Sequence, residues 1–159
     1  MIIAAWIVIL GLLSIPFWNL LENKTNPNRG LGAQTGGDGT GEVILLRNRQ
    51  GHYVAPGTIN GRPVAFMLDT GATVVSVPEA LARDIGLRPG RPITLQTANG
   101  PRRGWTTRLR RVTLGPIALE NVAAVINPGG EPAEVLLGMS FLKQLEFTQR
   151  GRELTLRRR

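Results

Sequence analysis

One aspartate in this sequence stands inside an apolar segment. Asp69 follows three apolar residues and opens the run Asp69-Thr70-Gly71-Ala72, after which apolar residues resume at Val74. A buried carboxylate is costly unless it is paired, hydrogen-bonded or protonated, so its position here suggests a chemical role. Asp, Thr and Gly are also common turn residues. Two interpretations of Asp69 therefore stand side by side, a turn cap and a reactive carboxylate.

A second segment further along the chain favours the reactive carboxylate. Leu136, Leu137 and Gly138 form an apolar-apolar-Gly site. By contrast, the residues needed for other chemistries are scarce, since the chain has no cysteine and a single histidine, His52. Zinc sites and Ser-His-Asp triads need imidazoles or thiolates around one centre, so both are disfavoured.

Short apolar runs separated by Gly, Pro and Asn fill the chain after residue 41. Asn60-Gly61 is a favoured dipeptide for a tight hairpin, because both residues tolerate a positive φ. Many short strands and few helices predict an all-β, closed barrel-like domain. We expect helices at 79–85 and 140–145, and strands at 43–46, 52–59, 62–68, 74–77, 93–97, 106–114, 117–126 and 154–157.

The N-terminal part differs in composition from the rest. Residues 1–21 are apolar and uncharged, about the length that crosses a bilayer as a helix, and they lack the basic start and cleavage site of a signal peptide. Residues 22–41 are rich in Gly, Asn and Thr, which predicts a flexible linker. We therefore expect a transmembrane anchor at 1–21, a linker at 22–41 and one domain at 42–159.

The net charge is +8, from 19 basic and 11 acidic residues. A nucleic-acid footprint clusters basic residues and interleaves them with aromatics. Here the basic residues are spread along the domain, and the densest clusters have only Trp105 nearby. We interpret most of the arginines as solubilising residues, which disfavours nucleic acid as a partner.

Four segments together resemble the aspartic proteases of the retropepsin type, and more narrowly a bacterial, membrane-anchored group of single-domain members. In chain order they are the strands around Asn60-Gly61, residues 67–72, the run Thr97-Ala98-Asn99-Gly100, and residues 136–142. The resemblance covers nearly everything from His52 onward. It implies a retropepsin-like domain with one or two short helices.

The resemblance implies a role for each residue of the first motif. Asp69 is the catalytic residue, Thr70 joins two active-site loops across a dimer axis, and Gly71 allows close approach of backbone and substrate. Ala72 matches the retroviral form of the motif. Because two carboxylates must share one proton across the attacking water, a chain with one such motif works as a homodimer.

The segment from residue 95 to Trp105 corresponds to the flap that closes over bound peptide. Asn99-Gly100 suits its tip, and the resemblance implies that Thr97, Ala98, Asn99 and Gly100 bind substrate. For Trp105, contact with substrate and packing on the body are equally expected. Arg102 and Arg103 favour acidic groups on a substrate.

Leu136, Leu137 and Gly138 resemble the element that supports the aspartate loop. Retroviral enzymes follow this glycine with an arginine that helps to hold the dimer, whereas this chain has Met139. An anchor that confines both subunits to one membrane would compensate by raising their effective concentration. The C-terminal residues 153–159 are expected either to join a sheet that spans two subunits or to form a basic tail.

These features predict an aspartic endopeptidase that cleaves polypeptide substrates as a homodimer, with no metal or organic cofactor. The alternative is a membrane-tethered, inactive binding module with the same fold. The resemblance places the domain on the periplasmic face of a bacterial inner membrane. Lys24 and Arg29, which follow the apolar segment, favour the cytoplasmic face instead.

Overall fold

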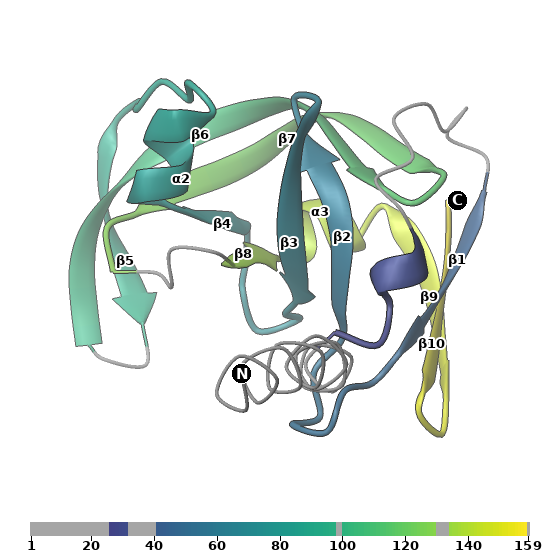
Figure 1. Cartoon of the computed structure of the whole chain (residues 1–159). Helices are drawn as coiled ribbons and strands as arrows, with labels where there is room; N and C mark the ends of the chain where they lie inside the picture. Colours follow the sequence, from purple (N-terminus) through teal and green to yellow (C-terminus); the bar gives the residue numbers. More distant parts are fainter. Residues whose placement is uncertain (1–25, 32–40, 98–99, 130–133, 159) are drawn as a thin grey trace, which may run out of the picture.

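The computed structural model describes residues 26–31, 41–97, 100–129 and 134–158, and this part of the chain is all-β (Figure 1). Besides a 3-10 turn, the described residues contain two short α-helices. In chain order the elements are η1 (Arg29–Leu31), β1 (Glu42–Leu46), β2 (Val54–Ile59), β3 (Arg62–Leu68), β4 (Val75–Pro78), α2 (Glu79–Asp84), β5 (Pro92–Thr97), β6 (Gly100–Leu114), β7 (Ile117–Asn127), β8 (Glu134–Leu137), α3 (Met139–Leu142), β9 (Leu145–Arg150) and β10 (Glu153–Arg158).

Six strands close into a barrel, which confirms the all-β, barrel-like prediction. Their order is β2-β3-β8-β4-β7-β6, and β6 returns to β2 through the pairs Thr58↔Thr113 and Ile59↔Val112. The two threonine hydroxyls at this closure lie 2.7 Å apart, so each satisfies the other inside the protein. β5 pairs only with β6 and continues the sheet beyond the barrel.

Alternating side chains build the core of the barrel. Phe66 from β3, Leu109 from β6 and Leu137 from β8 are fully buried, and Phe141 from α3 closes one end of the same cluster. Each such side chain contributes roughly 1.5–3 kcal/mol through its burial. The predicted hairpin at Asn60-Gly61 is present, with φ values of 52° and 82° and the pair Ile59↔Arg62.

Several predicted element bounds are wrong, for physical reasons. β6 begins at Gly100 rather than at residue 106; its first six residues, Gly-Pro-Arg-Arg-Gly-Trp, show no apolar alternation and were therefore missed. The helix expected at 140–145 is Met139–Leu142, and Leu145 already belongs to β9. β8 and β9 were not expected as strands, since β8 has four residues and β9 is mostly exposed.

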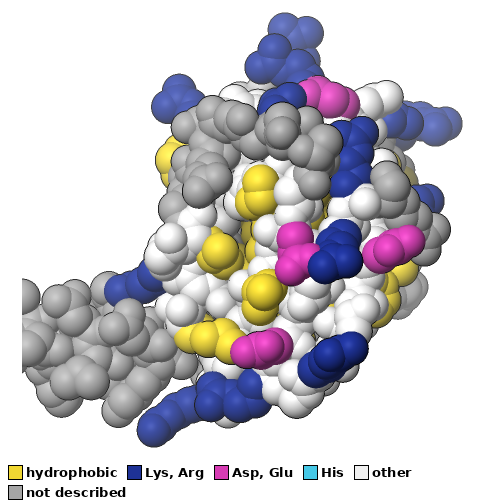
Figure 2. Space-filling model, turned by 90° about the vertical axis from the view of Figure 1, so that its right-hand side faces the viewer, with side chains coloured by type: hydrophobic (Ala, Val, Ile, Leu, Met, Phe, Trp, Pro, Cys, Tyr) yellow, Lys and Arg dark blue, Asp and Glu magenta, His cyan; other side chains and the backbone are white. Residues whose placement is uncertain are grey.

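A separate sheet, in the order β1-β10-β9, holds the C-terminal strand in its centre. β10 pairs with β1 on one side and with β9 on the other, so the predicted subunit-spanning role does not fit: its edges are occupied within the chain. Arg157 pairs with Glu42 across this sheet. Figure 2 shows this side of the molecule, where charged side chains surround apolar ones; Ile44 and Leu46 are exposed.

Part of the predicted linker is attached to the domain. The Asn28 amide donates to the carbonyls of Leu46 (2.9 Å) and Val54 (2.7 Å), and its oxygen accepts from Leu46 N (2.7 Å). Asn28 is buried, so a flexible tether does not describe this segment. The predicted anchor at residues 1–21 lies outside the described residues, and no described helix is long and apolar enough to cross a membrane.

Candidate active site

β8 places the supporting segment directly beside Asp69. It pairs in parallel with β3, with Leu68 opposite Leu137, and in antiparallel with β4, with Ser76 opposite Leu136. It thus lies between the strands that precede and follow the loop 69–74. Asp69 N donates to Leu137 O over 3.2 Å, which connects the aspartate to the end of β8. The two segments selected from the sequence therefore meet in space.

The carboxylate of Asp69 is held by its own turn. Asp69 Oδ1 accepts a hydrogen bond from Gly71 N (2.8 Å), and Asp69 O accepts one from Ala72 N (3.3 Å). A Cβ at Gly71 would lie 3.1 Å from Asp69 Oδ1, tighter than most contacts of this kind. Asp69 is half-buried and also lines a cleft. It therefore caps a turn and faces a cavity at once, so the two sequence-based interpretations are compatible.

Gly138 lets the end of β8 lie against the aspartate loop. A Cβ there would be 2.3 Å from Val74 O and 2.7 Å from Ala72 O, so only glycine fits without a shift of backbone. Directly after it, Met139 N donates to Ala72 O over 2.8 Å. Met139 thus supports the loop through its backbone.

Ser140 was not singled out from the sequence and completes this support. Its Oγ donates to Ala123 O (2.7 Å) and accepts from Val75 N (3.0 Å), while its own N donates to Thr73 O (3.1 Å). The side chain is buried and joins β7, β4 and the loop. The available signal was a single hydroxyl inside the apolar run 136–142, because buried polar groups are normally hydrogen-bonded.

A cleft of about 1180 Å³ runs from the aspartate loop to the β5–β6 hairpin. Its floor comprises residues of β4, β7, β8 and β6, and its far wall is formed by β5 and the segment 88–91. Asp69 is the single carboxylate among the described lining residues. Such a volume exceeds that of an ordinary small-molecule site and suits an extended peptide.

The segment predicted to be the flap forms a hairpin of β5 with the first half of β6. Thr97 lies opposite Gly100 and lines the cleft. Its Oγ1 donates a hydrogen bond to Gly100 O over 2.7 Å. Gly100 has a φ of 93°, which favours glycine at this turn. Ala98 and Asn99 lie outside the described residues.

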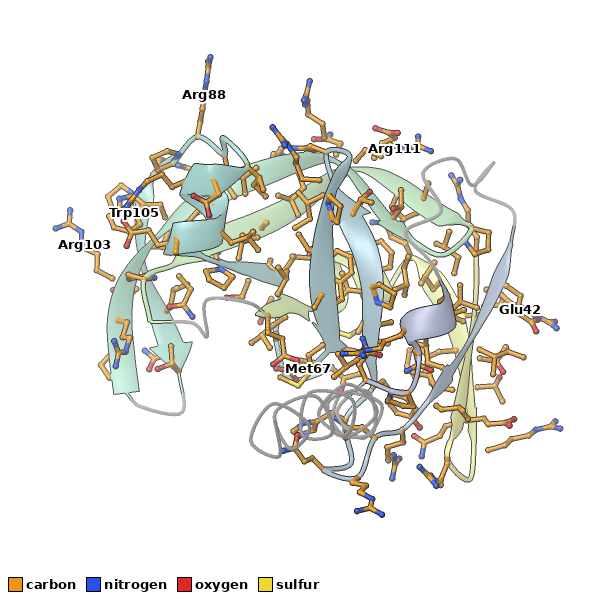
Figure 3. All side chains as sticks on the ribbon, viewed as in Figure 1. Glu42, Met67, Arg88, Arg103, Trp105 and Arg111 are labelled. Atoms are coloured by element: carbon orange, nitrogen blue, oxygen red, sulfur yellow. The ribbon has the colours of Figure 1, made fainter. Side chains whose placement is uncertain are left out.

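The aromatic and basic side chains of this hairpin point in different directions. Trp105 packs against the hydrophobic core and is not among the residues that line the cleft. Of its two expected roles, the structure therefore shows packing on the body. Arg103 points away from the hairpin into solvent (Figure 3). The side chain of Arg102 lies over Gly129. Neither of these two arginines lines the cleft.

The remaining predicted residues lie in the cleft, in the core or at the surface. Ala72 and Leu136 line the cleft, whereas Leu137 is fully buried beneath it. Thr70 is exposed beside Asp69. Among the described residues, a single chain therefore presents one carboxylate to the cleft, and the next residue of the motif, Thr70, is exposed to solvent.

The chain is similar in sequence to a family of aspartyl proteases and to two bacterial proteins. The model of a family described as gag-polyprotein putative aspartyl protease matches residues 55–144. An uncharacterized protein of Sinorhizobium sp, encoded in the cobV 5′ region, is 35% identical over 127 residues, which cover 77% of this chain and 54% of the relative. An uncharacterized protein of Rickettsia prowazekii (strain Madrid E) is 27% identical over 119 residues, which cover 73% and 51%. The chain thus spans about half the length of these relatives.

A solved structure shares the fold as well. The crystal structure of a retropepsin-like aspartic protease from Rickettsia conorii is similar with a TM-score of 0.62 and 31% sequence identity. The match covers 74% of this chain and 90% of that one. The likeness therefore extends over most of the described domain.

Proposed function

The chain belongs to the retropepsin-like aspartic proteases, and from this membership we propose that it is an aspartic endopeptidase acting on extended polypeptides. The observation that carries the proposal is the place of Asp69: its carboxylate, oriented by Gly71 N, lines a peptide-sized cleft beneath a hairpin. The loop that bears it is fixed by Gly138 and Ser140. Such fixed geometry is what a catalytic carboxylate needs.

The proposed chemistry uses two Asp69 carboxylates, one from each of two chains. Two carboxylates about 3 Å apart cannot both ionise, so they share one proton. The ionised group takes a proton from water, which attacks the scissile carbonyl carbon, while the protonated group donates to the carbonyl oxygen. The C–N bond then breaks as the amine nitrogen receives a proton.

The need for a second chain follows from the lining of the cleft. Asp69 is its single described carboxylate, and the nearest other aspartate in sequence, Asp84, is exposed on α2. A twofold axis beside the exposed Thr70 would bring a second Asp69 to the first. We therefore propose a homodimer whose axis passes between the aspartate loops.

Replacing the carboxylate tests the proposed hydrolysis. We expect Asp69→Asn to lower peptide cleavage by about 10²–10⁴-fold, because the amide keeps the shape but cannot exchange the proton. Asp84→Asn is the matched control and should cleave like the unaltered chain. Retained hydrolysis in Asp69→Asn would remove the proposal.

Mixing the two proteins tests the dimer. Because each site needs one Asp69 from each chain, an excess of Asp69→Asn chains should suppress the activity of the unaltered chain. Sedimentation of the full chain in detergent should give the mass of two protomers. A monomer that binds peptide without cleaving it would instead identify a binding module with this fold.

We further propose that residues 1–21 anchor the chain in a bacterial inner membrane with the domain in the periplasm. The support is the uncharged apolar run of the sequence. A reporter fused to the C-terminus, active in one compartment alone, should report the periplasm. Reporter activity in the cytoplasm would contradict the proposed orientation.

A further inference from the structure

Two arginines at the base of the flap hairpin have no part in the proposed hydrolysis. Arg91 and Arg108 both line the cleft, as does a third arginine, Arg88, whose side chain extends away from the fold (Figure 3). They flank Thr106: Arg91 O accepts from Thr106 N (2.9 Å), and Arg91 N donates to Thr106 Oγ1 (3.0 Å). Thr106 and Arg108 are two residues apart on one strand, so they share a face of the sheet. The two arginines thus belong to one corner of the cleft.

No carboxylate neutralises Arg108 in its described surroundings. Its guanidinium donates to Asn121 O (3.0 Å) and Asn121 Oδ1 (2.9 Å), which are both neutral acceptors. These bonds orient the side chain and leave its charge uncompensated. Among the described lining residues the single acid is Asp69. This corner of the cleft is therefore positively charged.

Three arginines elsewhere on the domain form ion pairs with glutamates. Arg83 pairs with Glu79, Arg111 with Glu120, and Arg157 with Glu42. None of these three arginines is among the residues that line the cleft. Unpaired positive charge in a cleft attracts anionic groups more strongly than the same charge on an open surface, because the walls focus the field.

The strand register places this corner at a useful distance from the aspartate loop. Arg108 lies opposite Ala123 on β7, and the next residue, Ala124, lies opposite Val75 at the start of β4. Two strand spacings separate Arg108 from the loop's end, about 10 Å, or about three residues of extended peptide. An acidic side chain bound there would avoid the negative charge of the Asp69 pair.

From these observations we infer that Arg91 and Arg108 bind an acidic side chain of the substrate, which makes them specificity residues for polypeptides with Asp or Glu a few residues from the scissile bond. This inference rests on the proposed function. Both arginines are exposed to water, which screens the attraction. We therefore expect discrimination between Glu and its neutral isostere Gln of about five- to tenfold, just below the range for hydrogen bonds to charged groups.

The test uses the full chain and peptides of equal length in which one position at a time carries Glu or Gln. One Glu position, on one side of the scissile bond, should raise kcat/KM about five- to tenfold over Gln. Arg108→Ala and Arg91→Ala should each reduce this ratio, and the double variant should bring it close to one. Arg108→Lys should retain part of it, because the charge remains.

Arg103→Ala is the matched control, since this arginine sits on the same hairpin and points away from it (Figure 3). It should leave the ratio unchanged. A Glu preference that is absent, or that falls equally in Arg103→Ala and Arg108→Ala, would overturn the inference, the latter by showing nonspecific attraction.

Binding to the Asp69→Asn chain separates this inference from the proposed function. Anisotropy of the labelled peptides should show the same Glu preference without any cleavage, and the preference should again depend on Arg91 and Arg108. If the unaltered chain cleaves nothing while this binding preference is found, the proposed hydrolysis fails and the acidic specificity stands. Equal binding of the Glu and Gln peptides overturns the specificity alone.

Discussion

The two walls of the cleft differ in how they are held. The aspartate loop is hydrogen-bonded at three of its residues, through Asp69 N to Leu137 O, Met139 N to Ala72 O and Ser140 N to Thr73 O. On the opposite wall β5 has one neighbour, β6, and forms the edge of its sheet. An edge hairpin with one partner strand opens at a lower free-energy cost than a loop hydrogen-bonded to a strand and a helix.

This difference suggests a division of work within the site. The tied loop keeps the carboxylate in one geometry, which proton transfer requires. We propose that the hairpin moves to admit and cover a peptide, as lids do in enzymes. Substitutions in the first wall should therefore change the free energy of unfolding, and those in the second should change substrate binding.

The largest expected effect on this comparison is that of Gly138→Ala. Its new Cβ would lie 2.3 Å from Val74 O, so backbone must shift on both sides of the loop. We expect the free energy of unfolding to fall by about 3 kcal/mol, together with loss of cleavage. Denaturant unfolding measures the first. Gly30→Ala, with no heavy atom within 4 Å of its Cβ, is the control and should leave stability close to that of the parent.

Ser140→Ala should have the next largest effect. It leaves the buried Val75 N and Ala123 O without their side-chain partner. The expected loss is about 2 kcal/mol, the cost of an unsatisfied buried group. Thr148→Ala, on the exposed strand β9, should change stability far less. Equal effects in the two variants would contradict the role assigned to Ser140.

Thr97→Val should have the smallest effect on stability. It removes one hydrogen bond, from Thr97 Oγ1 to Gly100 O, at the tip of the hairpin. We expect a loss of about 0.5 kcal/mol with a rise in KM that exceeds the change in kcat. Steady-state kinetics and denaturant unfolding on the same protein check both. A stability loss as large as that of Ser140→Ala would show that the two walls are equally tied.

Local patterns in the sequence were enough for part of this description. The Asp69-Thr70-Gly71 turn, the Asn60-Gly61 hairpin and the all-β class depend on neighbouring residues, because turn geometry and side-chain alternation act over a few positions. The apolar-apolar-Gly site at 136–138 was also recognised, although its role came from resemblance.

Tertiary structure alone decided what these residues meet. β8 inserts between β3 and β4, and this pairing brings Ser140 to Val75 across a long stretch of chain. The tertiary structure also places Arg108 in the cleft, packs Trp105 against the core and makes β10 a central strand. Alternation along a strand says which residues share a face, but it does not say which distant strand lies beside it. For that reason the sequence identified the carboxylate, and only the fold showed what holds it and which charges surround its cleft.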